Sequence, residues 1–398
     1  MQGCCCALAL SAKGAEVTIF EKNDRLLSRT AVANEGKIHL GYMYANDPSL
    51  STARMMVTGA LAFAPFLARH LELPAESFKV SEPATYVVHR DSQRSPDQVR
   101  EYLAAVHNII VEAAEGRANA YFGRDLSVGP RQCPAGELDD KFDRKIALAA
   151  FESPEVAIDP VALTETLRER IESDPRIGVR TDHEVLSVED KYDPIVVTKG
   201  PDGVARQGFD HVINALWDGR LAVDQRIGLG TRRPWLHRLK YGVSFRLPEH
   251  STRPPSATFV SGPFGEVVSY WDGLVYLTWY PACSVAISRE RVPPEWRTHP
   301  DEPLRSNIVT GTLDAMADFV LALRTWQKAD LLDLNVRGGV IVAWGKTDIY
   351  DPKSELHRRY EIGITSSGRF HSIDPGKLTM APYFAQLCAD HILSAGPL

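Results

Sequence analysis

The first 22 residues constrain the fold more than any other stretch of the chain. The small and apolar residues 3–12 predict a helix, Gly14 breaks it, and residues 16–22 predict an apolar strand that carries the acid Glu21 near its end. In a dinucleotide-binding βαβ unit, a Gly-rich turn and a helix N-terminus bind the pyrophosphate, and an acid roughly 20 residues further on binds the ribose hydroxyls. Gly3 stands where the last Gly of GxGxxG belongs, and Glu21 follows it by 18 positions.

The front half of that motif is missing before Gly3. Met1-Gln2-Gly3 resembles the tail of the Gly-rich turn, without the first strand and without the first two Gly residues. We therefore expect a dinucleotide-binding fold whose opening strand is cut off, with a start at an internal Met as the simplest cause. Loss of a central parallel strand leaves buried backbone donors unpaired, at roughly 1–3 kcal/mol for each group.

Composition excludes several classes of protein. The 398 residues, 44% hydrophobic and 24% charged, are typical of a globular chain with one large unit or two domains. A net charge of −6 with dispersed Lys and Arg argues against a nucleic-acid partner. No apolar segment approaches the roughly 18 residues of a membrane span, and no signal-peptide pattern opens the chain.

The six Cys residues predict neither disulfides nor a metal site. Cys4, Cys5 and Cys6 fan out around one helical turn, so we expect them to pack a helix against a sheet as small buried residues. The other three are isolated, and CxxC does not occur. A reducing cytoplasm is the expected location.

The rest of the chain alternates helical and strand patterns. Helices are predicted over 51–71, 96–115 and 160–173, near 302–328, and from 377 to 394. Strands are predicted over 84–90, 177–181, 184–190, 194–199, 203–206, 209–215 and 337–344. Residues 236–283 alternate and are rich in aromatics, which is typical of an antiparallel sheet. Loops are predicted over 121–142 and 366–375, and residues 31–42 are expected to form a loop or short helix that leads into a strand.

Four segments follow one another in a characteristic order. They are the 3–22 unit; Asn34-Glu35-Gly36-Lys37-Ile38-His39; the stretch from Ile158-Asp159-Pro160 through Glu184-Val185 to Asn214-Ala215; and Asp374-Pro375-Gly376-Lys377-Leu378-Thr379-Met380-Ala381-Pro382. Together they resemble the FAD-dependent oxidoreductases of the D-amino-acid-oxidase and glycine-oxidase type. The second resembles N-S-G-x-I-H, with Glu35 in place of Ser. The third departs from the ending Asn-Ala-x-Gly at Leu216-Trp217, and the fourth resembles G-x-G-x-T-x-x-P.

This resemblance implies an α/β fold. The expected architecture is a Rossmann-like FAD-binding domain of the glutathione-reductase type, with an inserted α+β substrate domain that contains an antiparallel sheet. We assign residues 1–50, 151–225 and 335–398 to the FAD-binding domain, and 51–150 and 226–334 to the substrate domain.

The resemblance also implies where FAD binds. The helix that follows Gly376 directs its N–H groups and positive dipole toward the pyrimidine edge of the flavin. The expected cofactor-binding residues are Gly3, Glu21, Lys22, Asn34, Gly36, Val185, Asn214, Ala215, Gly368, Gly376, Lys377, Leu378 and Thr379.

Three residues are candidates for catalysis. His39 suits a base next to the flavin, and a structural His is the alternative. Arg369 and His371 fall in the predicted loop before the last helix, from which this family often reaches a substrate carboxylate, and Arg suits bidentate pairing with that group. One or two of Tyr241, Tyr270, Tyr276 and Tyr280 are expected at the substrate cavity.

The leading hypothesis is an FAD-dependent oxidoreductase that oxidises a small amine or 2-hydroxy-acid-like substrate by hydride transfer to flavin N5. The substrate is a small molecule, and the electron acceptor stays open. A catalytically degenerate flavin-fold scaffold or binding protein is the alternative, favoured by the missing strand, Glu35 and Leu216-Trp217. An NAD-dependent dehydrogenase explains the half-motif but leaves the Gly376 segment unexplained.

Overall fold

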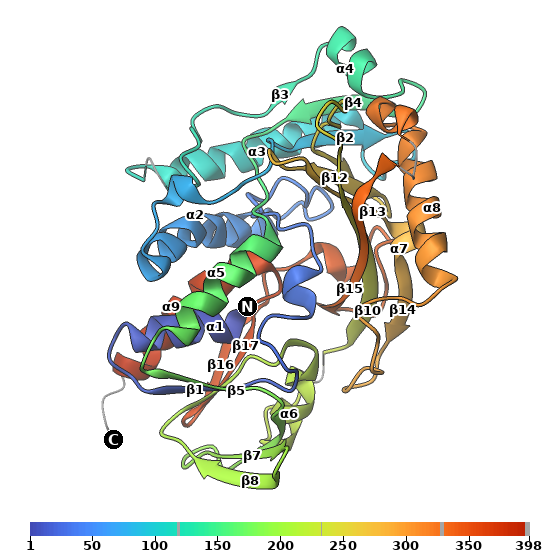
Figure 1. Cartoon of the computed structure of the whole chain (residues 1–398). Helices are drawn as coiled ribbons and strands as arrows, with labels where there is room; N and C mark the ends of the chain where they lie inside the picture. The colour runs from blue at the N-terminus through green and yellow to red at the C-terminus, as the bar shows by residue number, and fades with distance from the viewer. Residues whose placement is uncertain (118–119, 232, 327–329, 395–398) are drawn as a thin grey trace.

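The computed structural model describes residues 1–117, 120–231, 233–326 and 330–394. A stack of helices and a large curved sheet with helices of its own make up most of the molecule, and shorter strands lie below the helix stack (Figure 1). Within the described residues, no helix is long and apolar enough to cross a membrane.

The N-terminal half-motif folds as predicted. Helix α1 (Gln2–Ser11) leads into β1 (Val17–Phe20), which pairs in parallel with β5 (Ile177–Arg180). Strand β9 (Val212–Asn214) pairs in parallel with β17 (Phe370–Asp374), and β17 forms a hairpin with β16 (Gly363–Ser367). In the described chain these are two separate sheets, of two and three strands, and no strand joins them.

Five helices share one apolar core. Helix α1 packs against α9 (Ala381–Ser394), and α2 (Ser51–Leu71) packs against α9 and α3 (Pro96–Ala114). The fifth is α5 (Pro160–Glu172), whose N-cap Asp159 accepts the N–H groups of Val161 and Ala162 at 2.8 and 3.2 Å. All six cysteines are buried and free, and those of α1 belong to this core. The predicted packing role of these thiols is thereby confirmed.

Three antiparallel strands follow β5 and extend away from the helix stack, as Figure 1 shows: β6 (Glu184–Glu189), β7 (Ile195–Gly200) and β8 (Gly203–Gly208). The short helix α6 (Arg220–Arg226), which the sequence pattern did not predict, packs on β6 and contacts β9.

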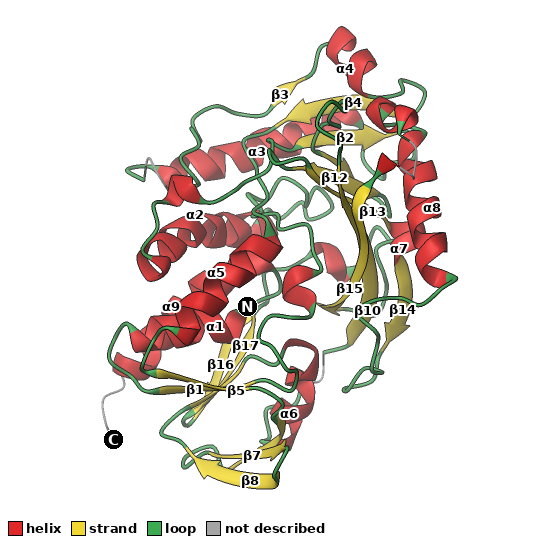
Figure 2. Ribbon diagram, in the orientation of Figure 1, coloured by secondary structure: helices red, strands yellow, loops and turns green. Residues whose placement is uncertain are grey.

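The large sheet has nine strands in the order β14-β10-β13-β12-β11-β2-β4-β3, with β15 on the other edge of β10. The described bounds are β2 (Thr85–His89), β3 (Arg131–Gln132), β4 (Ala147–Glu152), β10 (Trp235–Arg246), β11 (Ala257–Val260), β12 (Gly265–Ser269), β13 (Leu274–Trp279), β14 (Ser284–Ser288) and β15 (Leu332–Trp344). All pairs are antiparallel except β2–β11. Helices α7 (Tyr280–Cys283) and α8 (Leu304–Ala317) lie beside it (Figure 2).

Three predicted segments fold differently. The predicted loop over 366–375 is wrong: it is mostly the β16–β17 hairpin, whose turn contains Gly368 at φ +60°. The predicted loop 121–142 contains β3 and the helix α4 (Ala135–Lys141). Residues 31–42 form one 3₁₀ turn, Thr30–Val32, and a single bridge from Lys37 to Ala157 instead of a strand. In each case tertiary pairing decides what local pattern leaves open.

The proposed domain boundaries stay a prediction. One observation bears on them: helices α2 and α3, which we assigned to the substrate domain, share their apolar core with α1 and α9 of the FAD-binding domain. The two parts are therefore joined through a continuous core.

Candidate active site

One cavity of about 1810 Å³ runs from the N-terminus of α1, past β1 and β9, to the inner face of the large sheet. It exceeds ordinary small-ligand sites, which are about 300–1,000 Å³, so it has room for a dinucleotide and a small substrate together. Many of the predicted site residues line it: Gly3, Glu21, Lys22, Asn34, His39, Val185, Asn214, Ala215, Arg369, Gly376, Lys377 and Leu378. The predicted residues Gly36, Gly368, His371 and Thr379 are not among its lining residues.

The end of the cavity at α1 has the donors and acceptors that a dinucleotide needs. The first N–H groups of a helix have no partner within the helix, and those of α1 begin at the cavity wall beside Gly3. Glu21 uses one oxygen, Oε1, to accept the backbone N–H of Asn23 at 2.9 Å, together with its side-chain amide. The other carboxylate oxygen of Glu21 makes no hydrogen bond to a described residue.

The side chain of Asn214 stabilises the loop after β9 through hydrogen bonds. Its amide donates to Asp224 Oδ1 at 2.8 Å and to the Arg220 carbonyl at 3.0 Å, and its own oxygen accepts the N–H of Leu216 at 3.3 Å. The side chain of Asn214 is therefore committed to the fold, and only its remaining surface is available to a cofactor.

Trp217 stands where the resembling segment ends in Gly. Its backbone has φ +54°, a left-handed conformation that favours Gly, and its indole N–H donates to the Val340 carbonyl at 2.7 Å. The chain thus keeps the backbone conformation that a Gly adopts readily and adds a large side chain to the cavity wall.

The segment 34–39 is held as a tight loop. Asn34 accepts the N–H of Gly36 at 2.8 Å and donates to the carbonyls of Thr30 and Ala31. Gly36 has φ +69°, and a Cβ built on it meets the Ile158 carbonyl oxygen at 1.8 Å. Only Gly fits there, and this close approach sets the position of the two following side chains that matter chemically, Lys37 and His39.

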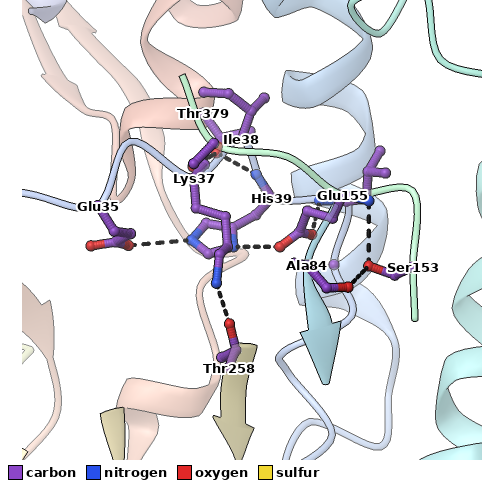
Figure 3. Close-up of polar contacts among 12 residues, drawn as sticks. Glu35, Lys37, Ile38, His39, Ala84, Ser153, Glu155, Thr258 and Thr379 are labelled. Atoms are coloured by element: carbon purple, nitrogen blue, oxygen red, sulfur yellow. Dashed lines mark hydrogen bonds and ion pairs between the residues drawn. The ribbon is translucent and has the colours of Figure 1, made fainter. Parts of the chain in front are cut away.

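The imidazole of His39 lies between two carboxylates, as Figure 3 shows. Its Nε2 is 3.9 Å from Glu35 Oε1, and its Nδ1 is 3.5 Å from Glu155 Oε1. Burial lowers the pKa of His39, and the charge of Lys377 lowers it further. His39 is 1% exposed and therefore neutral at pH 7.

Glu155 is fully buried behind His39 and is held from three sides. Its Oε2 accepts the backbone N–H of Leu40 at 2.6 Å, its Oε1 accepts the Tyr86 hydroxyl, and the backbone N–H of Glu155 itself bonds Ser153 at 3.3 Å. Although burial raises it, the neighbouring His39 and Lys37 bring the pKa of Glu155 below its ordinary value. The carboxylate is therefore a fixed negative charge next to Nδ1.

The same end of the cavity holds a group of cations. Lys37 is paired: its ammonium donates to Glu266 at 2.6 Å and to the Thr258 hydroxyl. Lys240 lies 4.9 Å from the centre of the Tyr280 ring, next to a register shift between β10 and β14 at Leu239/Lys240. Such irregularities re-aim side chains, here toward the cavity.

Two further cations come from the C-terminal part. Arg359 is 7% exposed, donates to the Gly376 carbonyl at 3.0 Å, and lines the cavity with Lys377. Burial, with Arg359 and Lys240 close by, lowers the pKa of Lys377 to about 8. The ammonium groups of Lys240 and Lys377 make no hydrogen bond or ion pair to any described residue. They face the cavity as open charges.

Arg369 and His371 are not brought together with His39. Arg369 stands at the start of β17, and its guanidinium is 3.5 Å from Asp193. His371 bonds Ser366 at 2.8 Å and His211 at 3.0 Å and stacks on the His211 ring. Both belong to the hairpin that replaces the predicted loop, and of the two only Arg369 lines the cavity.

Two other predicted cofactor residues have structural roles. Gly368 forms the hairpin turn, where a Cβ meets the Lys191 carbonyl oxygen at 2.4 Å. Thr379 accepts the backbone N–H of His39 at 2.9 Å and so fixes the start of the last helical segment against the 34–39 loop.

The sequence pattern missed five residues of this cluster: Glu155, Lys240, Thr258, Glu266 and Arg359. One signal was present for Lys240 and Glu266, since a charged residue inside a buried-type strand needs a partner or a ligand. For Glu155 and Arg359, which lie in connecting segments, no local signal exists.

Comparison with known proteins agrees with these features. Residues 1–326 match the family model of FAD-dependent oxidoreductases. Among solved structures, glycine oxidase from Geobacillus kaustophilus has a TM-score of 0.69 at 13% identity, over 98% of this chain and 91% of that one. L-α-glycerophosphate oxidase from Mycoplasma pneumoniae, with FAD bound, has a TM-score of 0.62 at 15% identity, over 98% and 91%. A sequence search of curated proteins found no match.

NikD, an unusual amino acid oxidase essential for nikkomycin biosynthesis, is similar too, with a TM-score of 0.65 at 12% identity over all of this chain and 92% of that one. These likenesses show the fold, a Rossmann-like domain combined with a substrate domain, and the residues present suit the cofactor: helix N–H groups for a pyrophosphate, a free Glu21 oxygen for a ribose, and a cavity of sufficient volume. From the family match over 326 of its 398 residues, the chain belongs to the FAD-dependent oxidoreductases.

Proposed function

We propose that this oxidoreductase oxidises a small substrate that carries an acid group, an amine or a 2-hydroxy acid, by removing a hydride from the carbon next to that group. The observation that carries the proposal is the juxtaposition of a buried neutral His39 with the cations Lys240, Lys377 and Arg359 in one cavity. A base and an acid-binding group at one place are what such a reaction needs.

FAD, when bound, would supply the hydride acceptor, its N5 atom. The residues of the chain bind the substrate and accept its proton. Lys240, Lys377 and Arg359 attract the acid group of the substrate, and we assign it to them in preference to Arg369, whose guanidinium faces Asp193. His39 accepts the proton from the O–H or N–H group at Nε2, and Glu155 stabilises the resulting imidazolium at Nδ1.

We further propose which residues hold FAD. Gly3 and the N-terminus of α1 bind the pyrophosphate, Glu21 with Lys22 contacts the adenosine ribose, and Val185 lies at the adenine end. The flavin end meets Asn34, Gly376, Lys377 and Leu378. Asn214, Ala215, Gly36, Gly368 and Thr379 support these contacts through the backbone and the loops that they hold.

The test is anaerobic reduction. The FAD-loaded protein is mixed with a panel of small α-amino acids, N-methyl amino acids and 2-hydroxy acids, and the loss of visible flavin absorbance is followed. We expect reduction by at least one member, at a rate that saturates with substrate concentration. An uncharged amine or alcohol of equal size should react poorly, because it leaves the cations unpaired.

A catalytically degenerate binding protein is the second candidate. Trp217 in the cavity wall and the separation of the β1–β5 sheet from the β9–β17 sheet favour it. FAD that binds to the protein and is never reduced by the panel supports this candidate and contradicts the first.

A further inference from the structure

One charged side chain at the cavity wall, Glu35, has no role in the proposed function. Glu35 stands where the resembling segment has a small Ser, and its side chain is 14% exposed at the cavity wall. Apart from the backbone N–H of Glu35 itself, no described residue donates a hydrogen bond to its carboxylate, and the one basic side chain within 4 Å among the described residues is the neutral His39, at 3.9 Å.

The charge of Glu35 has a definite origin. Burial opposes ionisation, but the positive charges of Lys240 and Lys377 outweigh it and lower the pKa of Glu35. Lys37, only two residues away, does not compensate the charge directly because its ammonium is bound to Glu266 and Thr258. Glu35 thus carries an open negative charge at the wall of a cavity whose other charges are positive.

Burial of a charge that has no direct partner is costly, and a ligand group of the opposite sign reduces that cost. Lys240 and Lys377 approach no described acid within 4 Å, and the one described basic side chain within that distance of Glu35 is the neutral His39 ring. A ligand with one anionic and one cationic group pairs with the two lysines and with Glu35 at the same time. A simple carboxylate or a 2-hydroxy acid satisfies the cations and leaves Glu35 unpaired.

We propose that Glu35 binds the cationic amino group of the substrate, so that the site selects a zwitterionic amino acid over the 2-hydroxy acid of the same shape. This inference rests on the proposed function. The ammonium loses one proton to His39, whose Nε2 lies 3.9 Å from Glu35 Oε1. With FAD bound as the hydride acceptor, the neutral amine would then give up the hydride of its α-carbon and be released as an iminium ion.

Glu35 is therefore a specificity-determining residue, and a binding measurement tests it without turnover. The probes are 2-aminoisobutyrate and 2-hydroxyisobutyrate, which have the same shape and no α-hydrogen to transfer. Their Kd values for the FAD-loaded protein follow from perturbation of the visible flavin spectrum. We expect the amino ligand to bind about tenfold to a hundredfold more tightly, as for a charged hydrogen bond.

Glu35→Gln should abolish that preference and change the Kd of 2-hydroxyisobutyrate less than about threefold. Glu35→Ser, which restores the small residue of the resembling segment, should do the same if the amide variant folds poorly. Glu172→Gln, on the exposed face of α5, is the control and should leave both Kd values unchanged. Circular dichroism and the bound FAD content check each variant.

Equal Kd values for the two probes in the wild-type protein, a preference that survives Glu35→Gln, or binding of neither probe would overturn the inference. The proposed function is tested separately. If only 2-hydroxy acids reduce the flavin, the proposed function is supported and the role of Glu35 is excluded. Flavin reduced by no acid of either class removes the proposed function itself.

Discussion

Nδ1 of His39 lies 3.5 Å from Glu155 Oε1, and Glu155 is 0% exposed. Nδ1 makes no hydrogen bond to a described residue in this arrangement, while the carboxylate is bound by Tyr86 and by the backbone of Leu40. A small approach of the ring toward Glu155 forms the missing bond and fixes Nε2 toward the cavity. The pair is thus suited to hold one tautomer of a catalytic base.

Removal of Glu155 should cost both stability and rate. Glu155→Ala leaves the Tyr86 hydroxyl and the Leu40 N–H unpaired in the core, which lowers the free energy of unfolding by about 2–4 kcal/mol. Urea denaturation measures this, with Glu172→Ala as an exposed control that changes it by less than about 0.5 kcal/mol. Glu155→Gln keeps an acceptor and should fold, yet it should slow flavin reduction and move the lower limb of its pH profile to lower pH, because a charge that favours imidazolium is lost. An unchanged profile contradicts a positioning role.

The pH dependence of flavin reduction should have two limbs, one caused by His39 and the other by Lys377. Burial keeps the pKa of His39 below its ordinary value, so the base form persists and kcat/KM falls only at a pH lower than that of a free imidazole. Lys377, with a pKa of about 8, loses its charge as the pH rises above that value, and KM for an acid substrate rises.

Matched variants assign those limbs. His39→Gln should reduce the rate about a hundredfold or more and abolish the lower limb, while FAD remains bound. Lys377→Met should raise KM at neutral pH and remove that upper limb. A profile of His39→Gln identical to the wild type would exclude it as the base.

For the buried pair of Lys37 and Glu266, we expect removal of one partner to lower the free energy of unfolding more than replacement of both partners. Lys37→Met leaves Glu266 as an uncompensated buried charge, at a cost of about 3–5 kcal/mol in the free energy of unfolding. The double variant Lys37→Met with Glu266→Leu should recover most of that loss. The exposed pair Arg297–Asp301 supplies the control, and Arg297→Met there should cost at most about 1 kcal/mol. Chemical denaturation of the wild type, Lys37→Met, the double variant and Arg297→Met measures these costs, and equal costs in Lys37→Met and the double variant contradict the argument.

Glu21→Ala tests the cofactor end of the cavity. The substitution removes the carboxylate oxygen that is free to bind ribose hydroxyls, and we expect FAD to bind about tenfold to a hundredfold more weakly. The measurement is a titration of the apoprotein with FAD, followed by flavin fluorescence. An unchanged Kd would move the adenosine end of the cofactor away from β1. Glu172→Ala should leave the titration unchanged.

Several elements are predictable from the sequence alone. Local pattern suffices for α2, for α5 with its Asp159 cap, and for the β6–β8 strands, since period, caps and turn residues are properties of neighbours in the chain. The same holds for α1 and β1, whose small residues and terminal acid predict a dinucleotide site. Gly36 is also readable, because a conformation at φ +69° favours one residue type.

Tertiary structure alone decided the chemistry. The β16–β17 hairpin exists because β17 pairs with β9 from far along the chain, and this pairing carries Arg369 and His371 away from His39. Glu155, Lys240 and Arg359 come from three distant segments, and no spacing in the sequence relates them. The burial that makes His39 neutral and the two lysines that keep Glu35 charged are properties of the assembled cavity. The sequence by itself determined the family and those elements whose pattern is local, and the packing determined which charges meet, because Coulomb interactions and desolvation depend on distance in space.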